Sequence, residues 1–197
     1  MKLSIIMPVW NVPYLTKRAL DSIPWDEDLE VIVVDDHSEQ ETVDILKRYE
    51  NMARIVYLEE NHRPNYCRNL ALDMCRGEYM FGMDCDDYLI TDEFRRAMKE
   101  LDGTDMVFIN QEVNSGFVFE LCEENKYHYC AFWTKFVRRD LIGDTRCPMK
   151  PITAGDYDFN LEIMKKPHTE KYTGIVAYHY NFPREGSLIW KKNHGLV

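Results

Sequence analysis

Three carboxylates gather in one short stretch of the sequence. Asp84, Asp86 and Asp87 stand within four positions, directly after the apolar run 78–83. Carboxylates this close repel one another and are costly to fold together unless they are solvated or face a cation. Mg²⁺ and Mn²⁺ take oxygen ligands, often one or two carboxylates together with substrate phosphates. The pattern therefore favours a site for a divalent metal and a diphosphate, and its alternative is an acidic turn that caps the next helix.

A second acidic group, of two carboxylates, follows another apolar run. Asp35 and Asp36 come directly after 29–34, where a carboxylate could accept hydrogen bonds from a base or a ribose. A turn that caps the following helix is the simpler interpretation of this pair on its own. No glycine-rich phosphate loop of the G-x-G-x-x-G or Walker type is present, so a metal would have to hold the phosphates.

The elements that must position these carboxylates alternate along the first half of the chain. Strand-like apolar runs cover 3–9, 29–34, 54–58, 78–83 and 104–110, and helical patterns cover 13–23, 42–49, 64–75 and 92–101. This alternation is typical of βαβ units and predicts an α/β fold with a Rossmann-like, mostly parallel central sheet flanked by helices. Open sheets of this kind bind ligands at the carboxyl ends of their strands, where both acidic groups lie.

The second half of the chain is less regular. After about residue 111 the sequence gives strand fragments, an aromatic-rich segment over 127–136, a helix that begins near Asp156 and a strand-like run over 171–180. No linker or repeat separates the halves. We therefore predict a single domain over 1–197, with a nucleotide-binding type of first half over 1–110 and a variable second half over 111–197.

Composition excludes several classes of protein. The 197 residues carry 24 Lys and Arg against 34 Asp and Glu, a net charge of -10, which disfavours a protein that coats nucleic acid. No apolar run approaches the roughly 20 residues that cross a bilayer, and no signal peptide is evident, so we expect a cytoplasmic protein without a transmembrane segment. The six cysteines form no CxxC pair and are expected to be reduced thiols.

The ordered motifs resemble a known family. Four segments look like the signatures of family 2 glycosyltransferases with the GT-A fold, and two later segments look like the family's acceptor-side and base motifs. The segments are 4–11, 31–38, 67–69, 77–87, 133–139 and 155–159. The resemblance implies an inverting, DxD-containing enzyme of the hexosyltransferase type, such as those of polysaccharide biosynthesis, with Mn²⁺ or Mg²⁺ as cofactor.

The resemblance also makes 1–110 the nucleotide-sugar-binding half and 111–197 the acceptor-side half with the catalytic base, and it implies roles for residues on the donor side. Pro8 and Trp10 would line the nucleotide pocket, Asp36 would bind the base and Arg68 would approach the diphosphate. Further residues are expected to hold the metal and the diphosphate. Asp84 and Asp86 would form the metal site, with His179 as a candidate third ligand, and Arg184 and Ser187 would help to hold the diphosphate.

On the acceptor side, the resemblance makes Asp156 the catalytic base. It would take the proton of an acceptor hydroxyl that attacks the anomeric carbon of a nucleotide sugar, most simply a UDP-sugar. Trp133 and Lys135 are candidate acceptor contacts. The family usually has Glu before the base, whereas this chain has Gly155, which leaves the orientation of the base open.

Two alternatives differ from an active transferase. One is a glycosyltransferase-like binding protein without turnover, which Gly155 keeps open. The other is a sugar-1-phosphate nucleotidyltransferase, whose chemistry favours a glycine-rich basic loop that residues 7–11 do not supply. The acceptor, a carbohydrate or another hydroxyl compound, stays open, a nucleic acid is disfavoured, and a homodimer is a further expectation.

Overall fold

The computed structural model describes residues 1–128, 130–149, 155–186 and 194. The strands are β1 (Leu3–Val9), β2 (Leu29–Asp35), β3 (Arg54–Tyr57), β4 (Tyr79–Gly82), β5 (Tyr88–Leu89), β6 (Met106–Val113), β7 (Val118–Phe119), β8 (Lys135–Arg138) and β9 (Glu170–Tyr180). The α-helices are α1 (Pro13–Asp21), α2 (Gln40–Leu46), α3 (Pro64–Met74), α4 (Thr91–Met98), α5 (Arg139–Ile142) and α6 (Gly155–Met164). Two short 3₁₀ helices are η1 (Lys47–Tyr49) and η2 (Phe132–Thr134).

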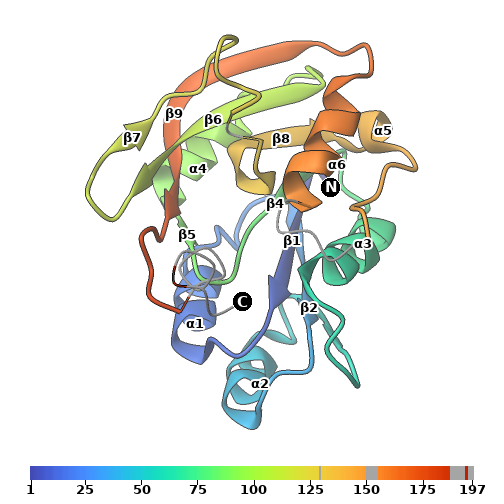
Figure 1. Cartoon of the computed structure of the whole chain (residues 1–197), viewed down its shortest axis with the longest axis vertical. Helices are drawn as coiled ribbons and strands as arrows, with labels where there is room; N and C mark the ends of the chain where they lie inside the picture. The colour runs from blue at the N-terminus through green and yellow to red at the C-terminus, as the bar shows by residue number, and fades with distance from the viewer. Residues whose placement is uncertain (129, 150–154, 187–193, 195–197) are drawn as a thin grey trace.

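One nine-stranded sheet runs through the molecule, in the order β3-β2-β1-β4-β8-β6-β9-β5, with β7 paired to β6 (Figure 1). The strands of the first half, β3, β2, β1 and β4, are all parallel to their neighbours. Strands β1 and β2 are apolar along most of their length, as expected of parallel strands covered on both faces. The α/β fold predicted from the alternation is confirmed.

Helices α1 and α2 pack against each other, and α3 packs against β1 and β2. The chain moves outward from β1 to β3 and then returns to place β4 on the other side of β1. Because such crossovers are right-handed, α3 covers the sheet face opposite to α1 and α2. The reversal of direction between β1 and β4 opens a crevice at their carboxyl ends, which is the usual ligand site of such sheets.

The second half differs from the prediction of a mostly parallel sheet. Strand β8 pairs antiparallel with both β4 and β6, and β5 pairs antiparallel with β9, so the complete sheet is mixed. Strands β5, β7 and β8 are two to four residues long and leave no alternating pattern to detect. A single cluster of buried apolar side chains includes residues from both halves.

Among the described residues, no helix combines the length and the apolar character needed to cross a membrane.

Candidate active site

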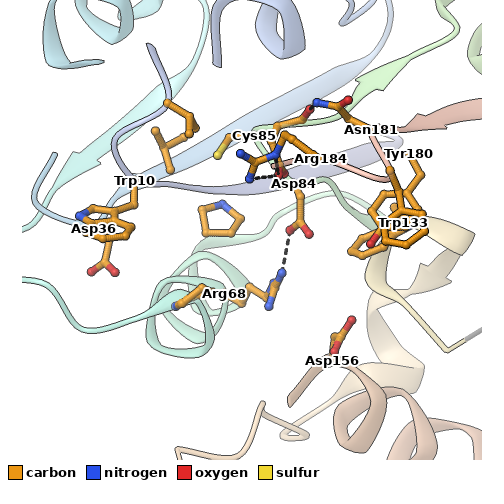
Figure 2. Close-up of a pocket in the computed structure, with 16 residues that line it drawn as sticks. Trp10, Asp36, Arg68, Asp84, Cys85, Trp133, Asp156, Tyr180, Asn181 and Arg184 are labelled. Atoms are coloured by element: carbon orange, nitrogen blue, oxygen red, sulfur yellow. Dashed lines mark hydrogen bonds and ion pairs between the residues drawn. The ribbon is translucent and has the colours of Figure 1, made fainter. Parts of the chain in front are cut away.

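A pocket opens where β1 and β4 end, and residues from both halves of the chain line it (Figure 2). The lining residues are Pro8, Val9, Trp10, Val12, Asp36, Pro64, Arg68, Asp84, Cys85, Asp86, Trp133, Asp156, Tyr180, Asn181, Phe182 and Arg184. The structure thus brings together most of the site residues predicted from the sequence. Ser187, predicted to help hold the diphosphate, lies outside the described residues.

The acidic loop after β4 has a different partner for each carboxylate. Asp84 accepts a hydrogen bond from Arg68 Nη2 at 2.7 Å, and Asp86 pairs with Arg184, whose Nη2 lies 2.6 Å from Oδ2. Both ion pairs are drawn in Figure 2. Asp87 points into the protein instead and is 1% exposed. Only Asp84 and Asp86 of this loop therefore present their carboxylates to the pocket.

Asp87 is a structural residue. Its two oxygens accept hydrogen bonds from the Tyr178 hydroxyl at 2.6 Å and from the backbone N–H of Asn181 at 2.8 Å. Burial raises the pKa of Asp87 well above its usual range, and the carboxylates of Asp86 and Asp84 raise it further. Asp87 therefore fixes the acidic loop to β9 and to the residues that follow it.

Arg68 lies between Asp84 and Asp156, whose carboxylates face the pocket from opposite sides. Burial lowers the pKa of Arg68, but Asp84 and Asp156 outweigh burial and raise that pKa overall. Burial raises the pKa of Asp84, and the Arg68 charge counteracts this. A permanent positive charge is therefore held at the centre of the pocket, close to where a diphosphate would meet the acidic loop.

The donor set of the acidic loop suits a hard divalent cation. Ligand oxygens of Asp84, Asp86 and Asp87 all lie within 4.8 Å of one another. Carboxylates are the ligands that Mg²⁺ and Mn²⁺ prefer. Because Asp87 is buried and each of its oxygens accepts a hydrogen bond inside the protein, Asp84 and Asp86 are the pair that could bind an ion together with a diphosphate.

Asp156 approaches the pocket from the other side. It lies in the first turn of α6, and Figure 2 shows its side chain pointing into the pocket that Arg68 and Asp84 also line. Within the described residues its carboxylate makes no hydrogen bond, whereas its backbone carbonyl accepts one from Asn160 at 2.8 Å. The helix N-terminus favours its negative charge. The geometry presents a free carboxylate to a ligand bound at the acidic loop.

The far end of the pocket is formed by the first two strands. Trp10 follows β1 and is half-exposed, with its ring free to cover a planar ligand. Asp36 lines the same end but is buried, and its two oxygens accept the backbone N–H groups of His62 and Arg63 at 2.7 and 2.8 Å. Asp36 therefore fixes the loop that leads into α3, a role that the sequence did not reveal.

Two predicted contacts are corrected by the structure. The expectation that Lys135 contacts an acceptor does not fit its position, because it is 1% exposed and its Nζ donates to the Ala131 carbonyl at 3.1 Å. His179 is not part of the acidic group. Its ring nitrogens lie 3.0 Å from Glu112 Oε1 and 2.9 Å from Asn114 Oδ1.

Two aromatic residues that were not predicted, Tyr180 and Phe182, form a wall of the pocket together with Trp133. Tyr180, at the end of β9, packs against Trp133 in a tilted arrangement with ring centroids 5.3 Å apart, and Phe182 stacks on Tyr180 at 5.4 Å. All three residues line the pocket. The signal available in the sequence was the two-residue spacing of Tyr178 and Tyr180 in a strand, which puts both rings on one face.

The comparisons with known proteins agree with this architecture. The family model described as glycosyl transferase family 2 matches residues 4–148. The poly(ribitol-phosphate) beta-N-acetylglucosaminyltransferase TarS of Staphylococcus aureus is 27% identical over 208 residues, covering 94% of this chain and 36% of TarS. The poly(ribitol-phosphate) beta-glucosyltransferase of Bacillus spizizenii is 39% identical over 97 residues, covering 45% of this chain and 15% of that protein. The chain thus spans about a third or less of the length of these two relatives.

Solved structures show the same fold. The crystal structure of S. aureus TarS 1–349 in complex with UDP-GlcNAc superposes with a TM-score of 0.82 at 24% identity, covering 95% of this chain and 60% of that one. The mannosyltransferase PcManGT from Pyrobaculum calidifontis, in complex with GDP-Man and Mn²⁺, gives 0.73 at 19% identity, with 98% and 60% coverage. The fold is therefore that of the GT-A glycosyltransferases. With the family model matching most of its length, the chain belongs to glycosyl transferase family 2.

Proposed function

We propose that this chain transfers a sugar from a UDP-sugar to an acceptor hydroxyl, with inversion at the anomeric carbon. The observation that carries the proposal is that Asp84 and Asp86 face one side of a single pocket while Asp156 faces it from the other, with Arg68 between them. Relatives support the donor class, because TarS has been solved in complex with UDP and with UDP-GlcNAc.

In the proposed reaction Asp156 acts as the general base. Its carboxylate takes the proton of the acceptor hydroxyl as the oxygen attacks the anomeric carbon, and the nucleoside diphosphate leaves on the opposite side of the sugar. A divalent ion held by Asp84 and Asp86 would neutralise negative charge on the diphosphate. Arg68 and Arg184 add fixed positive charge to the same region and hold the two carboxylates in place.

The nucleotide is proposed to occupy the end of the pocket near β1 and β2. Pro8 and Trp10 would pack against the base, because both line this end and Trp10 exposes its ring. Asp36 would shape the base site through the loop that it fixes, since both of its oxygens are already engaged by backbone N–H groups.

The acceptor is proposed to lie along the aromatic wall of Trp133, Tyr180 and Phe182, beside Asp156. Aromatic faces pack well on the C–H faces of sugars and polyols. Within the described residues the Tyr180 hydroxyl makes no hydrogen bond, so it can donate to an acceptor oxygen. The names of the two curated relatives include poly(ribitol-phosphate), which makes polyol and carbohydrate polymers the first acceptors to test.

A donor-binding protein without turnover is the second candidate, because Gly155 stands where the family usually has Glu beside the base. Measurements of donor binding and of turnover distinguish these two candidates. We expect calorimetry with UDP-GlcNAc, UDP-glucose and GDP-mannose to show Mn²⁺-dependent binding of a UDP-sugar that is lost with chelator. Slow release of UDP from the bound donor would then indicate an enzyme, binding without release would indicate the second candidate, and no binding of any nucleotide sugar would contradict both.

A further inference from the structure

One face of α3 is tied to the segment that precedes the base helix. Asn65, Asn69 and Asp73 stand four residues apart, so their side chains share one face of the helix. Asn69 exchanges two hydrogen bonds with the backbone of Cys147, at 2.9 and 2.7 Å. Asp73 pairs with Arg146, with Oδ1 2.6 Å from Nη2. This polar stripe fixes the course of the chain at 146–148.

Asn65, at the end of the stripe nearest the pocket, makes a further contact. Its Nδ2 donates to the Pro148 carbonyl at 2.9 Å, and its carboxamide lies against the Cα of Gly155. A Cβ added to Gly155 would stand 1.9 Å from Asn65 Nδ2 and 2.6 Å from its Cγ and Oδ1. Gly155 is buried and does not have a left-handed backbone conformation, so the Asn65 side chain is what excludes a larger residue there.

Gly155 opens α6 and is followed directly by Asp156. The Asn65 carboxamide therefore packs against the backbone at the start of α6, directly before the proposed base Asp156. Three residues further along α3, Arg68 holds Asp84 at 2.7 Å. One helix thus contacts both Asp84 and the start of the base helix, which ties the separation of Asp84 and Asp156 to α3.

The geometry points to Asn65 as a positioning residue for Asp156, acting through Gly155 in place of a larger side chain beside the base. The inference rests on the proposed function, because it assigns Asn65 a part in aiming the proposed base. It also explains how this chain accommodates glycine at position 155: the Asn65 side chain fills the space and orders the first turn of α6.

The test compares Asn65→Ala with Asp73→Ala, which removes a polar contact from the far end of the same stripe. UDP release from UDP-GlcNAc with Mn²⁺ is measured across pH. We expect Asn65→Ala to lower kcat about tenfold or more while the donor KM stays within about twofold, and to move the apparent pKa of the acid limb of kcat by about 0.5 or more. Asp73→Ala should lower the melting temperature about as much as Asn65→Ala does, and it should leave kcat and its pH profile close to wild type.

A second pair of variants tests the contact itself without relying on turnover. Gly155→Ala should lower the melting temperature by about 3 °C or more, because the new Cβ meets the carboxamide. Adding Asn65→Ala to Gly155→Ala should recover much of that loss in melting temperature, because removing the carboxamide makes room for the new Cβ. Failure of this rescue, or equal kcat effects in Asn65→Ala and Asp73→Ala, would overturn the positioning role. A wild-type protein that binds donor without releasing UDP would instead overturn the proposed function and, with it, this role.

Discussion

At the scale of single residues, the three carboxylates of the acidic loop have separate tasks. Asp84 and Asp86 face the pocket, each beside an arginine, whereas Asp87 is buried between the Tyr178 hydroxyl and the Asn181 backbone. A sequence cannot distinguish these tasks, because adjacent acidic residues look alike until the partners of each are known. The distinction leads to opposite expectations for two neighbouring variants.

Asp86→Ala should weaken Mn²⁺-dependent binding of a UDP-sugar about tenfold or more and leave the melting temperature nearly unchanged. Asp87→Ala should instead cost about 2–4 kcal/mol of unfolding free energy, because it strands the buried Tyr178 hydroxyl and the Asn181 N–H. Calorimetric binding and denaturant unfolding measure the two effects. Loss of stability in Asp86→Ala without loss of binding would refute the assignment.

Lys135 is a second residue whose task differs from its sequence-based interpretation. It is fully buried at the start of β8, with its ammonium directed to the Ala131 carbonyl and the Thr134 hydroxyl and 5.7 Å from the centre of the Phe108 ring. Burial lowers its pKa from 10.5 to about 8. Charging this group in the folded protein therefore costs stability, on the order of 3 kcal/mol.

Lys135 makes the stability of the protein depend on pH. Between about pH 8 and 10.5 the unfolded chain holds the Lys135 proton and the folded protein does not, so this group makes the free energy of unfolding rise with pH. Lys135→Met should be more stable than wild type at pH 7, and this advantage should shrink as the pH rises through that window. Urea unfolding at several pH values measures it, and a difference that does not vary with pH would be inconsistent with a buried titrating lysine.

At the scale of elements, the residues after β9 close one side of the site. The Asn181 side chain donates to the Asp86 carbonyl at 3.1 Å, and Arg184 pairs with the Asp86 carboxylate through two nitrogens. Arg18, from α1, donates to the same carbonyl at 2.8 Å. The position of Asp86 is thus set by elements from both ends of the chain.

Arg184→Ala should have effects of opposite sign on two ligands. Mn²⁺ alone should bind about threefold or more tightly, because Asp86 loses a competing positive charge. A UDP-sugar in the presence of Mn²⁺ should bind about tenfold more weakly, because the diphosphate loses a cation. Parallel titrations measure both, and a change of the same sign for both ligands would contradict the proposed role of Arg184.

The long elements could be predicted from the sequence because each carries its own periodic pattern. Strand β1 has the predicted bounds, 3–9, and α3 differs from its predicted range by one residue at its end. The short strand β8 could not be predicted, since its four residues are defined by pairing with β4 and β6 rather than by local pattern. The same limit explains the Lys135 error, because burial of a lysine depends on that pairing.

At the scale of the whole molecule, the site exists because the sheet reverses its order between β1 and β4. The order of motifs along the chain was enough to predict that the acidic strand ends meet in one crevice. The contacts between distant segments were beyond the sequence, because no local pattern signals them. Asn65 against Gly155 and Asp36 against the backbone of the 62–63 loop are two examples.

Helix α3 connects these parts. It contacts the sheet at β1 and β2, holds Asp84 through Arg68 and reaches the start of α6 through Asn65. One helix therefore contacts both Asp84 and the residue that precedes Asp156. We expect mutations to separate donor binding from transfer of the acceptor proton, because the proposed donor-binding carboxylates and the proposed base lie on opposite sides of the pocket.

The most direct test compares wild type with Asp156→Asn, first by calorimetric binding of UDP-GlcNAc with Mn²⁺ and then by UDP release from the same mixture. We expect Asp156→Asn to keep donor affinity within about threefold of wild type and to lower turnover by about 100-fold or more, because the amide cannot accept the proton. Turnover equal to wild type at equal donor affinity would contradict the central claim that Asp156 is the base.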